Sequence, residues 1–204
     1  MVFRCRSIDF LERAEQLRSD NDPARLLYAA LELRLGIEMR LNEYAAHVIG
    51  ISKAKAQEWE IKRLGKTLHE AYGLGEKMLV IIMRLSDESE AQFLYAPVSH
   101  RLQEIGKRLG AFLHVPRLIT SAFGDSDQEE LRTLLHEGCG LLRLACAGEV
   151  LRPSMSDGIL VALDGDDPRS RLIESYQRGV EAEFHVFDIT PAGPVTYYPA
   201  DDGH

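Results

Sequence analysis

One long amphipathic stretch constrains the fold of this chain more than any other feature. Asp22 is a good helix cap and Pro23 suits the first helical position, so the sequence predicts a helix over residues 23–48. Apolar residues recur along it at helical spacing and form one stripe, which we expect to be buried in the core of a helical bundle. The members of the stripe are Leu26, Ala30, Leu33, Ile37, Leu41, Tyr44 and Val48.

A second amphipathic helix is predicted within residues 97–117, and its end is sharply defined. Pro116 biases Val115 away from helical geometry, so the helix should end near Leu113 or His114. Its apolar stripe consists of Leu102, Ile105, Leu109 and Phe112.

Gly106, Gly110 and His114 follow one another at four-residue intervals on this helix. A second face of the helix therefore lacks side chains up to His114, where Arg108 and Arg117 are near in sequence. We expect something bulky, either a partner helix or a ligand, to approach His114 along this face.

The remainder of the first 150 residues is also predicted to be helical. The apolar run 76–85 is ambiguous, because its centre has the composition of a strand; we interpret it as a buried helix from its helical flanks. Gly138 and Gly140 are expected to interrupt or kink the last helix. The further predicted helices cover residues 8–19, 52–72 and 126–144.

The pattern changes after residue 150. Short apolar runs bounded by turn residues predict strands at 159–163, 183–190 and 195–198, and residues 169–178 read as one more helix. We therefore predict a mainly α fold, an antiparallel helical bundle over residues 1–150 with a small α+β tail over residues 151–204.

The composition favours a cytoplasmic protein without a cofactor. No apolar run approaches the ~20 residues needed to span a membrane, and the N-terminus lacks the apolar segment of a secretory signal. The three cysteines, Cys5, Cys139 and Cys146, show neither the number nor the spacing of a disulfide framework or a structural zinc site. We expect no membrane contact, no metal and no other cofactor.

The net charge of -8 is distributed unevenly along the chain. Residues 1–117 contain 18 Lys and Arg against 16 Asp and Glu, whereas residues 118–204 contain 6 against 16. A nucleic-acid binder needs a basic footprint, so any contact with RNA must be local and confined to the first part. The acidic part is compatible with autoinhibition of a nuclease, with recruitment of a protein partner, or with solubility alone.

Two Arg/His pairs are candidate catalytic groups: Arg108 with His114, and Arg40 with His47. An Arg and a His separated by four to six residues on a small antiparallel helical bundle resembles the HEPN superfamily, over residues 8 to about 117. Many members of that superfamily are metal-independent RNases of toxin-antitoxin, abortive-infection and CRISPR systems, and others are non-catalytic. The resemblance implies an active site that is composite across a homodimer.

The chemistry fits the residue types of both pairs. His can move a proton near neutral pH, and Arg can hold a phosphate with two hydrogen bonds. Arg40 and His47 share a helix face but are separated by about 10 Å of rise, whereas Arg108 and His114 diverge by roughly 120° on a regular helix. The superfamily's placement of the motif on a late helix favours Arg108 and His114.

Two hypotheses remain open at the level of sequence. The first is a homodimeric endoribonuclease of a bacterial phage-defence or toxin-antitoxin system, with His114 as general acid/base and Arg108 as phosphate holder. The second is a non-catalytic dimerisation module whose acidic tail recruits a protein partner, such as an antitoxin. Under the second, both histidines are structural residues at helix ends, and Arg34 with Glu38 forms a salt bridge instead of a phosphate site.

Overall fold

The chain is mainly helical, as predicted. The computed structural model describes residues 5–20, 22–48, 60–72, 76–84, 90–114, 123–149, 151–154, 158–161 and 181–188. In chain order, the elements are α1 (Ser7–Arg18), α2 (Pro23–Ala45), α4 (Ile61–Tyr72), β1 (Lys77–Arg84), β2 (Glu90–Tyr95), α5 (His100–Phe112), α7 (Asp125–Ala147), β3 (Leu151–Ser154), β4 (Gly158–Val161) and β5 (Glu181–Asp188).

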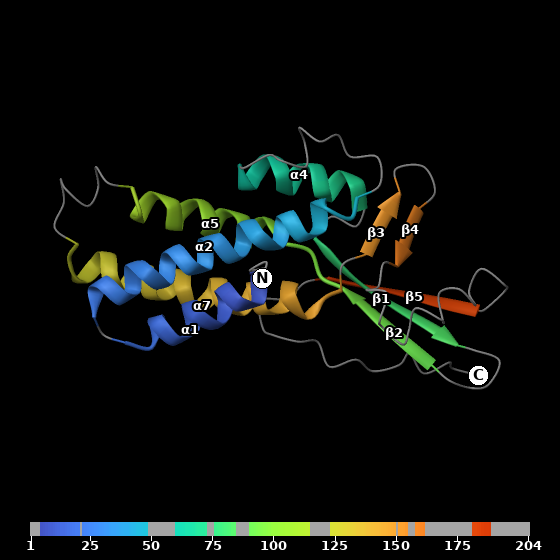
Figure 1. The fold of residues 1–204 in the computed structure, drawn as a ribbon, viewed down its shortest axis with the longest axis horizontal. Helices are drawn as coiled ribbons and strands as arrows, with labels where there is room; N and C mark the ends of the chain where they lie inside the picture. Colours follow the sequence, from blue (N-terminus) through green and yellow to red (C-terminus); the bar gives the residue numbers. More distant parts are fainter. Residues whose placement is uncertain are drawn as a thin grey trace, which may run out of the picture.

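Helix α2 lies at the centre of the bundle and contacts α1, α4, α5 and α7 (Figure 1). Helices α1 and α5 run antiparallel to α2, and α7 runs in the same direction as α2. The sheet extends from the end of the bundle at which α2 and α7 finish. Within the described part of the chain, no helix is both long and apolar enough to cross a bilayer.

The predicted start and apolar stripe of α2 are confirmed. The side chain of Asp22 accepts a hydrogen bond from the backbone N–H of Ala24 at 2.9 Å, and Pro23 occupies the first turn. Every member of the stripe is buried in the common core, from Leu26 to Val48. The helix itself ends at Ala45.

The prediction of a helix over residues 76–85 is wrong, because β1 covers most of this run and pairs antiparallel with β2. Ile81 and Ile82 point to opposite faces of the strand, yet both are buried. A strand that is covered on both faces reads as a continuous apolar run, which period-two alternation does not reveal. The β-branched residues at its centre were the correct signal.

Strand β5 pairs antiparallel with the other side of β1, which gives the strand order β2-β1-β5. A strand from the predicted tail thus belongs to the same sheet as two strands from the first 150 residues. The predictions of strands near 159–163 and 183–190 are confirmed by β4 and β5, and β3 pairs with β4 as a separate hairpin. The predicted helix 169–178 and strand 195–198 lie outside the described residues.

Helix α7 is continuous, so the expected interruption at Gly138 and Gly140 is wrong. Gly138 is buried where α7 meets α2 and α5, and a methyl group there would lie 2.8 Å from Leu33 and 3.0 Å from Ile105. Gly140 is exposed and has nothing within 4 Å of its added methyl position. A glycine inside a helix lowers helix stability by only about 1 kcal/mol relative to alanine, so the helix continues through both positions.

We expect opposite effects from alanine at two glycines of this region. A methyl group on Gly148, the residue that follows α7, would lie 2.6 Å from the backbone nitrogen of Ala96, so Gly148→Ala should lower the free energy of unfolding by about 1–3 kcal/mol. Gly140→Ala should raise it by up to about 1 kcal/mol, because the site is an open helical surface. Urea denaturation of both variants measures the two changes. Equal stability of the two variants would contradict this packing.

Candidate functional site

Arg108 and His114 lie near the same end of α5 but face different surroundings. The guanidinium of Arg108 reaches across to α7 and binds the Glu130 carboxylate at 2.6 Å. His114 is exposed and directly follows Leu113, whose backbone N–H still bonds to Leu109 and keeps helical geometry. Among the described residues, no hydrogen bond or ion pair joins Arg108 to His114. Val115 and Pro116, which were expected to end the helix near Leu113 or His114, lie outside the described residues.

The glycine face of α5 is covered by the chain's own side chains, which differs from the expected approach of a partner helix or ligand. A methyl group on Gly106 would lie 2.9 Å from Ile61 of α4 and 3.3 Å from Ile37 of α2. At Gly110, a methyl group would overlap the Nη1 atom of Arg34. The missing side chains therefore make room for α2 and α4 within one chain.

Arg34 is thus brought to within one helical turn of His114. Its Nε donates to Glu38 Oε1 at 3.0 Å, and its Nη1 lies over Gly110, four residues before His114. Helix α5 ends at Phe112 with Leu113 as its cap, so His114 directly follows the turn over which the Arg34 guanidinium lies. The sequence identified Arg34 and Glu38 as a pair but gave no means of linking them to His114.

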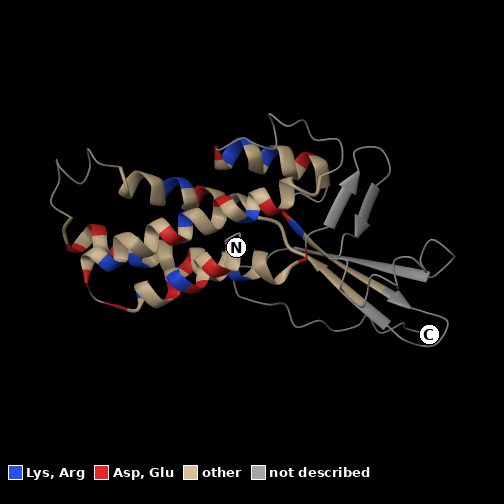
Figure 2. Cartoon of the chain, viewed as in Figure 1, with Lys and Arg blue, Asp and Glu red and all other residues tan. Residues whose placement is uncertain are grey.

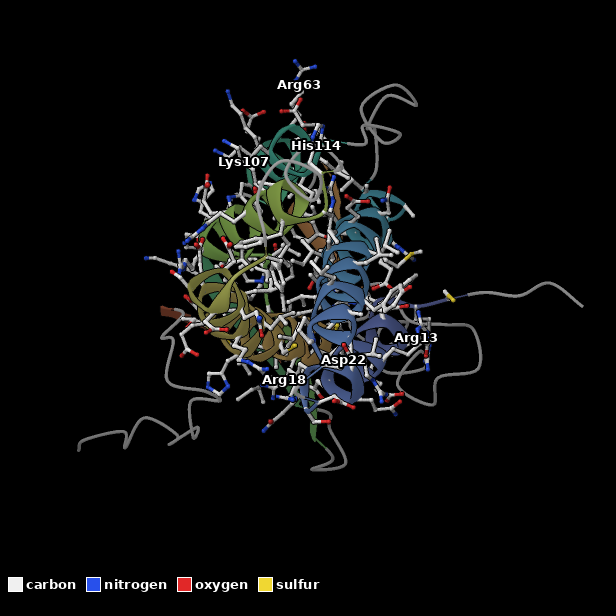
Figure 3. The ribbon with its side chains drawn as sticks, turned by 90° about the vertical axis from the view of Figure 1, so that its left-hand side faces the viewer. Arg13, Arg18, Asp22, Arg63, Lys107 and His114 are labelled. Atoms are coloured by element: carbon white, nitrogen blue, oxygen red, sulfur yellow. The ribbon has the colours of Figure 1, made fainter. Side chains whose placement is uncertain are left out.

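Helices α4 and α5 carry more basic than acidic side chains of their own, and five of the six basic ones pair with glutamates. Helices α4 and α5 together contain six Lys and Arg against two Glu, and blue bands mark both helices in Figure 2. Figure 3 shows Arg63 of α4 and Lys107 of α5 on the same side of the bundle as His114. A local contact with RNA in the first part of the chain stays a prediction.

Arg40, by contrast, is enclosed in the structure and only 5% exposed. Its Nη1 donates to Glu43 at 2.9 Å, and its Nη2 donates to the Tyr44 hydroxyl at 2.9 Å and to the Gly148 carbonyl. Tyr44 in turn donates to the carbonyl of Ala96. Arg40 therefore joins α2 to the end of α7 and, through Tyr44, to the segment before α5.

The ionisation of this cluster reflects its burial. Although burial acts against the charged guanidinium, the neighbouring Tyr44 and the hydrogen bond to Glu43 raise the pKa of Arg40 overall. Burial raises the pKa of Tyr44 to about 12, against the opposing effect of Arg40. His47 lies at the end of α2, where its Nδ1 is 2.9 Å from the carbonyl oxygen of Glu43, so it takes part in a local backbone contact.

A cluster of His69, Glu76 and His100 was not predicted from the sequence. His69 comes from α4, Glu76 immediately precedes β1, and His100 begins α5. Glu76 Oε1 lies 3.1 Å from His100 Nδ1 and 3.6 Å from His69 Nε2. The three residues are far apart in the sequence and match no metal-ligand spacing, so no pattern could have revealed them.

The two histidines of this cluster differ in exposure. The His69 side chain is 12% exposed and its Nε2 is 3.3 Å from the Val98 carbonyl oxygen, whereas the His100 side chain is 69% exposed. Burial lowers the pKa of His69, with Glu76 opposing the shift and His100 adding to it. A lower pKa favours the neutral ring, which is the form that coordinates metals.

No protein-family model, no curated protein and no solved structure matches this chain. Its function must therefore be argued from the geometry of the described residues.

Proposed function

We propose that the end of α5 at His114 cleaves RNA without a metal ion, in the manner expected from the HEPN resemblance. The observation that carries the proposal is the position of Arg34, whose guanidinium lies over Gly110, one helical turn before His114. A permanent cation beside an exposed imidazole is the minimum that this chemistry requires. The excess of basic over acidic side chains on α4 and α5 supports the same reading.

In this proposal, Arg34 takes the role of phosphate holder that the sequence suggested for Arg108. Arg108 is bound to Glu130 on α7, whereas the Arg34 guanidinium lies over Gly110, four residues before His114. Glu38 binds the Nε of Arg34 and thereby orients the guanidinium towards α5. Bidentate binding of phosphate depends on such orientation.

The reaction follows from these roles. His114 accepts the proton of a ribose 2′-hydroxyl, and the 2′ oxygen attacks the adjacent phosphorus while Arg34 stabilises the phosphate oxygens. The bond between phosphorus and the 5′ oxygen breaks, and that oxygen takes a proton from water. The products are a 2′,3′-cyclic phosphate and a 5′-hydroxyl, and the imidazolium returns its proton to solvent.

The assay that tests the proposal is cleavage of an end-labelled structured RNA by the full chain in excess EDTA. We expect products ending in a cyclic phosphate and a steep loss of cleavage as salt rises, because the contact with RNA is electrostatic. Intact RNA at low salt, with a protein whose circular dichroism shows that it is folded, would contradict the proposal.

A second candidate function, a non-catalytic dimerisation module, is favoured by exposed apolar side chains on α2. Tyr28, Leu31 and Leu35 are 60%, 40% and 36% exposed and lie along one face of the helix. Arg34 and Glu38 lie one turn apart along one edge of this face and carry opposite charges. If a second copy packs its α2 antiparallel against the first, Arg34 of each copy can lie near Glu38 of the other, so the two edges do not repel each other. We therefore propose a second copy of this chain as its occupant. The same contact would bring two Arg34 sites together, which is compatible with a homodimeric nuclease.

We expect Leu31→Glu combined with Leu35→Glu to convert a dimer into a folded monomer. Two buried carboxylates in the contact would disfavour association by several kcal/mol, whereas the monomer keeps both positions in water. Light scattering after size-exclusion chromatography measures the mass, and Thr133→Glu on the exposed face of α7 is the matched control. A wild-type monomer at high concentration, or a dimer that survives both substitutions, would remove α2 as the interface.

A further inference from the structure

We propose that His69, Glu76 and His100 form a binding site for a divalent transition-metal ion of the zinc type. Each residue offers one ligand atom, and the three atoms lie within 4.8 Å of one another. Ligands at the usual zinc distances in a tetrahedron are separated by about 3.4 Å. The two Glu76 contacts, at 3.1 and 3.6 Å, already match this separation, so only the two imidazoles must draw closer.

The carboxylate of Glu76 is held in place before any metal binds. Both of its oxygens accept from the backbone N–H of His100, at 2.9 and 3.0 Å. The carboxylate thus caps the start of α5 while its Oε1 faces both imidazoles. The rings of His69 and His100 meet edge to face, with their centroids 4.6 Å apart. A site whose carboxylate is already oriented loses little side-chain freedom on binding.

A second layer of contacts allows His69 to coordinate without leaving a polar group unpaired. The Val98 carbonyl lies 3.3 Å from His69 Nε2 and also accepts from Gln103 Nε2 at 2.8 Å. If the His69 nitrogen turns to a metal, the carbonyl keeps its bond to Gln103. The buried Gln103 amide fits here because Gly65 of α4 has no side chain, and a methyl group there would overlap it.

The ligand set selects the class of metal. Two imidazoles and one carboxylate suit zinc and its neighbours Co²⁺ and Ni²⁺, whereas Ca²⁺ and Mg²⁺ prefer oxygen ligands alone. Three protein ligands leave a fourth position for water, and the exposure of His100 places that position towards solvent. A bound ion would join α4, the segment before β1 and the start of α5, where the helices meet the sheet (Figure 1). These residues lie at the opposite end of α5 from His114, so the site is independent of the proposed nuclease.

The test uses the full chain without a polyhistidine tag, stripped of metal with EDTA and dialysed. Titration with Co²⁺ should give visible absorption of a four- or five-coordinate ion at one ion per chain, and Zn²⁺ should displace it. His100→Ala, whose side chain is largely exposed, and Glu76→Gln should each weaken Zn²⁺ binding by roughly 100-fold or more, since even outer contacts of a metal site are worth 10–100-fold.

The controls distinguish this site from surface histidines. His136→Ala removes an exposed imidazole of α7 and should leave Zn²⁺ affinity unchanged. Bound Zn²⁺ should also raise the melting temperature of the wild type but not of Glu76→Gln, whose metal-free melting temperature reports whether it folds. Absence of stoichiometric binding, or binding that survives both His100→Ala and Glu76→Gln, would overturn the proposal.

Discussion

His114→Ala should remain folded and cleave RNA at least about 100-fold more slowly than the wild type, because general acid–base catalysis contributes 10²–10⁴-fold. The side chain is exposed at the end of α5, so its loss opens no cavity in the core. Single-turnover cleavage in EDTA measures the rate, and the melting temperature of the variant should stay close to that of the wild type.

Variants at Arg34 separate the phosphate holder from the general base. Arg34→Ala should slow cleavage, and Arg34→Lys should recover only part of the rate, because lysine lacks the planar fork. Gly110→Ala should displace the guanidinium without removing it, and Gly140→Ala is the matched glycine control, with nothing near its methyl position. If Arg108→Ala loses cleavage and Arg34→Ala does not, Arg108 is the residue that binds the phosphate.

Arg40→Met should lower the free energy of unfolding by about 3 kcal/mol or more. Removing the guanidinium leaves the Tyr44 hydroxyl and the Gly148 carbonyl without a donor from this side chain, and leaves the Glu43 carboxylate without its cation. Urea denaturation measures the change, and hydrogen exchange should show the largest loss of protection where α2 meets the end of α7.

Arg25→Ala is the matched control for Arg40. Arg25 also lies on α2 and pairs with Asp20 at 2.9 Å, but both side chains are about half exposed, so its loss should cost less than about 1 kcal/mol. If Arg40→Met proved as stable as Arg25→Ala, the buried cluster would not be a structural clamp. Stability close to the wild type combined with lost RNA cleavage would instead move the catalytic site to Arg40 and His47.

The sequence predicted the helices whose ends and stripes are set locally. Asp22 and Pro23 fix the start of α2, and α5 ends at Phe112 with Leu113 as its cap, one residue before the predicted end near Leu113 or His114. The β1 run was mistaken for a helix because both of its faces are buried, so it shows no alternation, and only its pairing with β2 and β5 makes it a strand. That information lies in the pairing of segments distant in sequence, which a local window does not contain.

The candidate sites were less predictable, because they depend on contacts between elements. The sequence predicted His114 as a catalytic residue from its position near a helix end. The position of Arg34 over Gly110, by contrast, depends on how α2 packs against α5. One of the buried contacts of Arg40 likewise involves Gly148, which is more than 100 positions away. His69, Glu76 and His100 meet only when α4, β1 and α5 come together.

The pairing of β5 with β1 sets the order in which this protein completes its fold during synthesis. β1 meets β2 almost as soon as the two are made, whereas β5 leaves the ribosome roughly 100 residues after β1, a delay of about 5–20 s at ordinary elongation rates. During that interval, the second edge of an apolar strand stays open to other chains. Products that stop before residue 181 keep this edge permanently, so β5 protects the finished protein against aggregation as well as completing its sheet.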